Sequence, residues 1–202
     1  AGAAAGGTMA SILGLEREQV DAICRDAGGL VVGANYNAPG QIVISGEVGA
    51  VERASALAKE RGARRVLPLN VSGAFHSPLM EAAAARLAEE LARTPLSDAR
   101  VPVVANVTGN TVQSAGEIRD ALVRQVTGSV LWEDSVRRMA ADGVTTFVEV
   151  GPGQVLSGLV RRIVPEARTL QAGDAASIAA TAEELRKAQD VKRKAPCSAR
   201  VS

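Results

Sequence analysis

The alternation of apolar and polar positions in residues 8–69 predicts short strands separated by amphipathic helices. Four apolar runs have strand length: TMASILGL, LVVGAN, QIVISG and RRVLPL. Between them, EREQVDAICRDAG and EVGAVERASALAKERG show helical spacing, and their closing residues, Gly28 and Gly62, are typical of helix ends. The resulting order, βαββαβ, is that of a split βαβ or ferredoxin-like unit, in which both helices cover one face of a four-stranded sheet. We therefore predict an α/β chain with a ferredoxin-like subdomain over residues 8–69.

A region of longer helices is predicted after this unit. Ser77 can cap a helix whose first residue is Pro78. Apolar residues recur every four positions along that helix, which predicts a buried stripe of Leu79, Ala83, Leu87 and Leu91.

Strands and helices alternate through the rest of this region. VPVVANV predicts a buried strand, residues 115–126 and 132–141 predict helices, and VTTFVEV predicts a strand that runs into the turn GPGQ. A helix over residues 155–163 and the short run ARTL follow. The alternation predicts an α/β layer with parallel strand pairing over residues 70–174.

The two ends of the chain have a different composition. Residues 1–7, AGAAAGG, consist of alanine and glycine and predict a flexible start. Residues 175–202 predict a helix followed by the basic stretch VKRKAPCSARVS. That stretch either binds anions or is a solvated tail.

Composition excludes several functional classes. The chain has 23 Lys and Arg against 22 Asp and Glu, so no net field favours nucleic acid or an anionic membrane surface. The two cysteines, Cys24 and Cys197, are too few and too far apart for a disulfide framework or a thiolate metal site. No apolar run approaches the ~20 residues of a membrane helix. We expect a cytoplasmic protein that requires no metal or cofactor.

The stretch VSGAFHSPLM contains the only histidine of the chain, His76. It lies one residue before the predicted helix cap, where the positive end of a helix favours a neutral ring, as a general base requires. A histidine with only a packing or surface role is the alternative. With no second histidine in the chain, a metal site at this position is not supported.

A general base needs a nucleophile, and no G-x-S-x-G elbow occurs in the chain, because Ser45, Ser72 and Ser157 all lack the flanking glycines. Neither cysteine has an activating context that sequence can show. The residues alone therefore predict no catalytic dyad.

Two further stretches carry candidate binding residues. In NYNAPGQIVISG, Asn35 and Asn37 either place amides at the mouth of a strand pair or only form turns before Pro39 and Gly40. VEVGPGQVLSGL is either an anion-binding loop at a helix start or a simple chain reversal. No phosphate-loop motif occurs, so nucleotide binding is unsupported.

Together, NYNAPGQIVISG, VSGAFHSPLM and VEVGPGQVLSGLVRRI, in this order, resemble the malonyl-CoA:acyl carrier protein transacylases of fatty acid and polyketide synthesis. The resemblance runs from about Met9 to Leu170. In that family a ferredoxin-like subdomain is inserted in a large α/β-hydrolase-like domain. The resemblance therefore implies that residues 70–174 are the C-terminal part of the large acyltransferase domain.

The resemblance also implies roles for single residues. His76 matches the histidine that deprotonates a serine nucleophile during ping-pong transfer of malonyl from malonyl-CoA to acyl carrier protein. Gln125 matches the glutamine whose backbone carbonyl orients that ring. Asn35 and Asn37 would lie near the active-site cleft. Phe75 matches the selectivity position beside the histidine and favours malonyl over methylmalonyl.

Other family motifs have no counterpart in this chain: the oxyanion loop, the GHSLGE nucleophile elbow, and the arginine that pairs with the malonyl carboxylate. We therefore expect the isolated chain to be inactive. The alternative is a non-catalytic module that binds the acidic acyl carrier protein through Arg64, Arg65, Arg161 and Arg162.

Overall fold

A computed structural model describes residues 7–194 of the chain. The chain divides into two compact units, Ala1–Gly143 and Val144–Ser202. The boundary predicted near Leu69 lies inside the first unit and stays a prediction. The expected flexible start, apart from Gly7, and the end of the basic tail lie outside the described residues.

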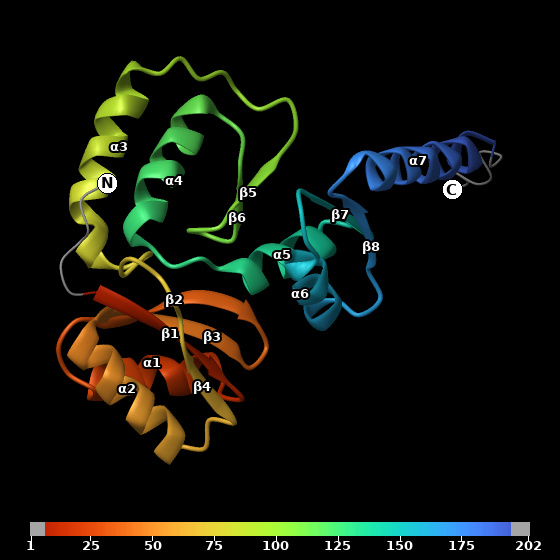
Figure 1. Cartoon of the computed structure of the whole chain (residues 1–202). Helices are drawn as coiled ribbons and strands as arrows, with labels where there is room; N and C mark the ends of the chain where they lie inside the picture. Colours follow the sequence, from red (N-terminus) through yellow and green to blue (C-terminus); the bar gives the residue numbers. More distant parts are fainter. Residues whose placement is uncertain (1–6, 195–202) are drawn as a thin grey trace, which may run out of the picture. The chain divides into compact units, whose positions relative to one another are not determined.

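The first unit begins with the predicted order of strands and helices, which the structure confirms (Figure 1). Each helix ends before a glycine of positive φ, 65° at Gly28 and 92° at Gly62, a conformation that disfavours residues with a side chain. The elements are β1 (Gly7–Leu13), α1 (Arg17–Asp26), β2 (Val31–Ala38), β3 (Gln41–Glu47), α2 (Val48–Glu60) and β4 (Arg65–Pro68).

These strands form one four-stranded antiparallel sheet in the order β2-β3-β1-β4. The central strand β1 pairs along its whole length with β3, and from Ala10 onward also with β4. A two-residue turn joins β2 to β3, and its second residue, Gly40, has a φ of 66°, as a type II turn requires. Because β2 stands first in the strand order, it is an edge strand of this sheet.

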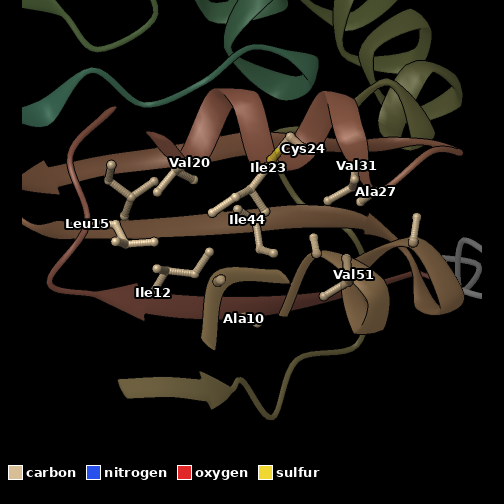
Figure 2. Packing of buried hydrophobic residues seen from close by; sticks show 14 of the residues in the cluster. Ala10, Ile12, Leu15, Val20, Ile23, Cys24, Ala27, Val31, Ile44 and Val51 are labelled. Carbon is tan, nitrogen blue, oxygen red and sulfur yellow. The ribbon is translucent and has the colours of Figure 1, made fainter. Parts of the chain in front are cut away.

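The main core lies between one face of this sheet and its two helices. Alternate strand residues such as Ile12 and Ile44 share one buried cluster with Val20 and Ile23 of α1 and with Val51 of α2, so both helices cover the same face (Figure 2). The intervening positions form a smaller cluster that includes Met9, Ala34 and Val43. The period-two pattern of the strands thus separates two buried faces.

In the remainder of the first unit, helices α3 and α4 pack against each other (Figure 1). The predicted stripe on α3 is partly wrong, because Ala83 is exposed and Ala84 is buried instead, together with Leu91. A 3-10 turn, Pro78–Met80, precedes α3. The elements are α3 (Glu81–Arg93), β5 (Val103–Ala105), β6 (Asn110–Val112), α4 (Ala115–Thr127) and α5 (Trp132–Ala141).

The strand predicted from VPVVANV is shorter and more exposed than expected. Only three of its residues form β5, and these pair antiparallel with β6, an element that the sequence pattern did not indicate. Val101 and Val103 are 66% and 42% exposed. The prediction of parallel pairing was therefore wrong for this segment. A short turn reverses the chain after β5, so that β6 runs antiparallel beside it.

The helix predictions for α4 and α5 are confirmed. At the start of α4, the Ser114 hydroxyl accepts a hydrogen bond from the Glu117 N–H, and the Glu117 carboxylate accepts one from the Ser114 N–H. This reciprocal pair satisfies two backbone donors that the first helical turn leaves unpaired.

The second unit contains the one parallel strand pair among residues 7–194, β7 with β8. Helix α6 connects these strands, and α7 packs against β8. The elements are β7 (Thr146–Val150), α6 (Val155–Ile163), β8 (Arg168–Ala172) and α7 (Ala175–Lys194). Within the described part of the chain, no helix is long and apolar enough to span a membrane.

Candidate active site

His76 lies in the loop that connects β4 to α3, and its backbone conformation is unusual. Its φ is 57°, the only positive value at a non-glycine residue between residues 7 and 194. Positive φ costs most side chains free energy, and residues held in it often belong to functional sites. The ring is half-buried, whereas the neighbouring Phe75 is 40% exposed.

The tight turn around His76 is closed by Ser77. Its hydroxyl, fully buried, donates a hydrogen bond of 2.7 Å to the carbonyl oxygen of Ala74. We predicted that this hydroxyl would cap the following helix; that prediction was wrong, because Ser77 forms no side-chain cap bond. The hydroxyl instead connects the residues on the two sides of Phe75 and His76.

The imidazole of His76 contacts the end of helix α4. Its Nδ1 lies 2.9 Å from the backbone carbonyl oxygen of Gln125. A carbonyl oxygen can only accept, so Nδ1 must carry the proton of this bond. In the neutral ring the lone pair is then on Nε2. Within the described residues, Nε2 has no hydrogen-bond partner, so it is available to take a proton.

Gln125 also contributes its side chain, a role that the sequence analysis did not predict. Its amide Nε2 donates to the carbonyl oxygen of Gly128 at 2.9 Å and lies 3.4 Å from that of Ser129. The side chain thus holds the backbone that leaves α4. Its amide also lies 3.5 Å from Nδ1 of His76, but the shorter contact with the imidazole, 2.9 Å, is made by the main-chain carbonyl of the same residue.

Asn35 and Asn37 both lie within strand β2 and are half-buried. The alternative that they form the turn was therefore wrong, because the turn consists of Pro39 and Gly40. Asn35 is paired through a parallel bridge with Val130, five residues after Gln125. The structure thus places Asn35 in the same backbone network as Gln125, although neither asparagine side chain forms a hydrogen bond to another described residue.

The GPGQ turn in the second unit contains Gly151 and Gly153, with φ of 124° and 97°. The carboxylate of Glu149 accepts hydrogen bonds from the N–H groups of Leu156 (3.1 Å) and Ser157 (2.7 Å) at the start of α6. Hydrogen bonding from Ser157 lowers the pKa of Glu149. The interpretation as an external anion site is unsupported, because the protein's own carboxylate occupies these donors.

A polar cluster lies where α1 meets β2 and α5. Tyr36 donates a 2.5 Å hydrogen bond to Asp21, and burial together with this bond raises the pKa of Tyr36 above its ordinary value. The guanidinium of Arg17 lies 4.3 Å from the centre of the Tyr36 ring and pairs with Asp134 at 2.9 Å. Burial raises the pKa of the neighbouring Cys24 from 9.0 to about 12, so this thiol is a poor nucleophile.

Three cavities of the described chain are not lined by His76. One of about 760 Å³ lies between α2 and the start of β1, and two others, of about 460 and 220 Å³, border Tyr36. Within residues 7–194, no three His, Cys, Asp or Glu side chains form a group that could hold a metal. The predicted basic residues Arg64 and Arg65 of the first unit are exposed, as are Arg161 and Arg162 of the second.

Sequence reasoning missed two serines of this region. Ser77 was assigned a different hydrogen bond, and Ser129 was not considered, although its hydroxyl donates a 2.6 Å bond to the carbonyl oxygen of Gly33 on β2. Both act through contacts with backbone carbonyls, for which sequence patterns carry no signal.

Comparison with known proteins gives a consistent result. Residues 2–196 match the family described as acyl transferase domain. The malonyl CoA-acyl carrier protein transacylase of Bacillus subtilis is 44% identical over 187 residues, which is 91% of this chain and 59% of that protein. The chain thus spans less than two thirds of the length of this relative.

Solved structures agree with this comparison. The crystal structure of an acyl carrier protein S-malonyltransferase from Vibrio cholerae has a TM-score of 0.85 at 43% identity, covering 88% of this chain and 58% of that one. A type II PKS acyl-carrier protein in complex with its malonyl-transacylase gives a TM-score of 0.85 at 42% identity, covering 89% and 59%.

Proposed function

The chain belongs to the acyl transferase domain family, and on this premise we propose that it is part of an enzyme that transfers malonyl from malonyl-CoA to the phosphopantetheine thiol of acyl carrier protein. The observation that carries the proposal is the 2.9 Å bond between His76 Nδ1 and the Gln125 carbonyl oxygen, which leaves Nε2 as the base. The relatives named above support malonyl and acyl carrier protein as the reactants.

In the first half-reaction, Nε2 of His76 takes the proton of a serine hydroxyl while the serine oxygen attacks the thioester carbonyl of malonyl-CoA. The C–S bond breaks, and the CoA sulfur leaves with the proton from the imidazolium. In the second half-reaction, Nε2 takes the proton of the carrier thiol, whose sulfur attacks the acyl-serine ester. The C–O bond breaks, and the serine oxygen regains the proton from His76.

Gln125 serves this chemistry through its carbonyl, which stabilises both the Nδ1–H tautomer and the imidazolium that forms during transfer. The serine would come from the family's GHSLGE elbow, a motif that these 202 residues do not contain. We therefore propose that the isolated chain is inactive. We also propose that Phe75 contacts the acyl group and favours malonyl, which its exposure beside His76 supports.

Two assignments of fold and location accompany this proposal. We assign β1–β4 with α1 and α2 to a ferredoxin-like subdomain, supported by the order β2-β3-β1-β4 and by the shared core of both helices. We assign residues 70–174 to the C-terminal part of the larger acyltransferase domain. We expect the enzyme to act in the cytoplasm.

The proposal is tested in a full-length protein in which this chain replaces the matching part of the Bacillus subtilis relative. His76→Ala is expected to lower kcat/KM for malonyl transfer by about 10²–10⁴-fold, because the general base is lost. Glu89→Ala is the matched control: Glu89 is an exposed residue on α3, and its replacement should leave kcat/KM unchanged. A His76→Ala variant with undiminished activity would refute the assignment.

The isolated 202-residue chain provides the second test. We expect no transfer of malonyl from malonyl-CoA to acyl carrier protein, and measured transfer would contradict the proposed inactivity. A non-catalytic role in binding is favoured instead if the chain binds carrier protein with an affinity that falls with salt and with the change Arg64→Ala, because this surface pairing is screened by ions.

A further inference from the structure

We propose that Ser129 is a positioning residue for His76: its hydroxyl fastens the segment after α4 to the edge of β2 and so fixes the Gln125 carbonyl at Nδ1 of the ring. The inference deepens the proposed function, because it rests on His76 acting as a base through Nε2. Ser129 contacts neither substrate nor ring and acts only through the backbone.

The first step concerns why the Gln125 carbonyl is available. Helix α4 ends at Thr127, and Gly128 adopts an extended backbone with ψ of 153°. The Gly128 N–H bonds to the Arg124 carbonyl at 2.9 Å, so the next carbonyl, that of Gln125, is the first without a helical donor. His76 supplies the missing donor. The position of this carbonyl therefore depends on where the chain goes after Gly128.

The second step concerns the contacts that fix this path. A side chain at Gly128 would place its Cβ 2.8 Å from both the Arg124 carbonyl oxygen and Cγ2 of Val107, so the segment approaches its neighbours more closely than other residues allow. The Gln125 amide donates to the Gly128 carbonyl from inside the turn. These contacts hold the segment from the side of α4.

The third step is the attachment to β2. The N–H of Val130 donates to the Ala34 carbonyl at 2.8 Å, and the N–H of Tyr36 donates to the Val130 carbonyl at 2.9 Å. Ser129 adds the 2.6 Å bond from its hydroxyl to the Gly33 carbonyl. The segment and this hydroxyl therefore attach to backbone groups of β2, the edge strand of the sheet.

Of these attachments, the Ser129 hydroxyl bond is the one that a substitution can remove without changing the backbone. Its loss leaves the carbonyl of the buried Gly33 without this donor and lets the segment move. A displaced Gln125 carbonyl stabilises the Nδ1–H tautomer less. The ring then places its proton on Nε2 more often, and in that tautomer it cannot act as the base.

The experiment uses the fact that the chain contains a single histidine. Long-range ¹H–¹⁵N correlation spectra of the ¹⁵N-labelled 202-residue chain, recorded where the ring is neutral, report its tautomer without assignment ambiguity. The native chain should show Nδ1–H as the main form. Ser129→Ala should lower the ratio of Nδ1–H to Nε2–H by about three- to tenfold, the effect of weakening one hydrogen bond.

Ser114→Ala is the matched control. It removes a hydroxyl from the other end of the same helix, where Ser114 accepts a hydrogen bond from the Glu117 N–H. This change should destabilise α4 by a comparable amount but leave the His76 tautomer unchanged. Unfolding curves followed by the fluorescence of Trp132, the only tryptophan, show how far each variant is destabilised.

Ser129→Thr and Ser129→Val form a second pair, because their side chains have the same shape and differ in the hydroxyl. Thr should retain the native tautomer ratio, and Val should lower it; this pair decides the question if the alanine variant does not fold. Equal ratios in Thr, Val and the native chain overturn the role of Ser129. A native ring that is mainly Nε2–H overturns instead the proposed orientation of His76 by Gln125.

Discussion

Residues 7–69 and residues 70–143 belong to one compact unit but are held together in different ways. The first region surrounds a continuous core in which Ile12, Ile23 and Ile44 are 0% exposed. In the second, Leu122 on α4 is 44% exposed and Val101 before β5 is 66% exposed. Part of the second region is connected to the first through backbone hydrogen bonds between β2 and the segment around Val130.

This difference matters because His76 and Gln125 both lie in the second region. A site held by hydrogen bonds on a region with few buried side chains has low local stability, which is typical of segments that bind and move. The first region acts as the rigid support, since its edge strand β2 fixes the segment that follows Gln125.

The largest expected difference between the two regions is in the free energy of unfolding that is lost when an apolar side chain is truncated. Ile44→Ala should lower the free energy of unfolding by about 2–5 kcal/mol, because it creates a cavity in the centre of the sheet core. Leu122→Ala should cost less than about 1 kcal/mol, because that side chain is already half in water. Guanidinium titration followed by circular dichroism measures both. Equal losses would show that the two regions are packed alike.

Glycine substitutions should separate the regions by the sign of the effect. A Cβ at Gly46 on β3 would collide with the Leu30 carbonyl and lie 2.7 Å from the Val31 Cα, so Gly46→Ala should destabilise by about 1–3 kcal/mol. Gly116 on α4 has open space around it, and Gly116→Ala should stabilise by about 0.4–1 kcal/mol. Thermal unfolding measures both, and a stabilising change at Gly46 would contradict the close approach of β3 to the chain before β2.

Smaller effects are expected in the pH dependence of the unfolding free energy, at alkaline pH for the first region and at acidic pH for the second. The pKa of Cys24 in the first region is raised from 9.0 to about 12, so above pH 9 the unfolded chain loses this proton first. Unfolding free energy should then fall with rising pH, by at most about 1.4 kcal/mol per pH unit for this group. Cys24→Ala should reduce that slope, as measured by denaturant titration at several pH values.

In the second region the unfolding free energy should change with pH in the opposite direction. Hydrogen bonding from Ser114 lowers the pKa of Glu117 below its usual 4.5, so the contribution of the α4 capping pair is present above that pH and is lost as the pH falls. Glu117→Gln should remove this acid dependence without altering the alkaline slope. An alkaline slope that survives in Cys24→Ala would assign it to Tyr36, whose pKa is also raised.

Local sequence patterns were sufficient to predict the elements of residues 7–68, because period-two strands, helical spacing and terminal glycines all act over a few neighbouring residues. The sequence also identified the family through three motifs, and with it His76 as the candidate base. Where the pattern was brief, as in VPVVANV, the prediction was wrong, since a run of seven apolar and small residues does not show whether the chain continues or turns back.

Which side chains and backbone groups come into contact could not be predicted from these local patterns and follows from the packing of the chain. His76 and Gln125 are 49 positions apart, and their bond depends on a helix that ends at Thr127 and leaves a carbonyl without its helical donor. The attachments of Ser129 to Gly33 and of Ser77 to Ala74 are likewise bonds from hydroxyls to backbone carbonyls. Every residue has a carbonyl, so its use as a partner leaves no mark on the sequence and follows only from how the chain packs.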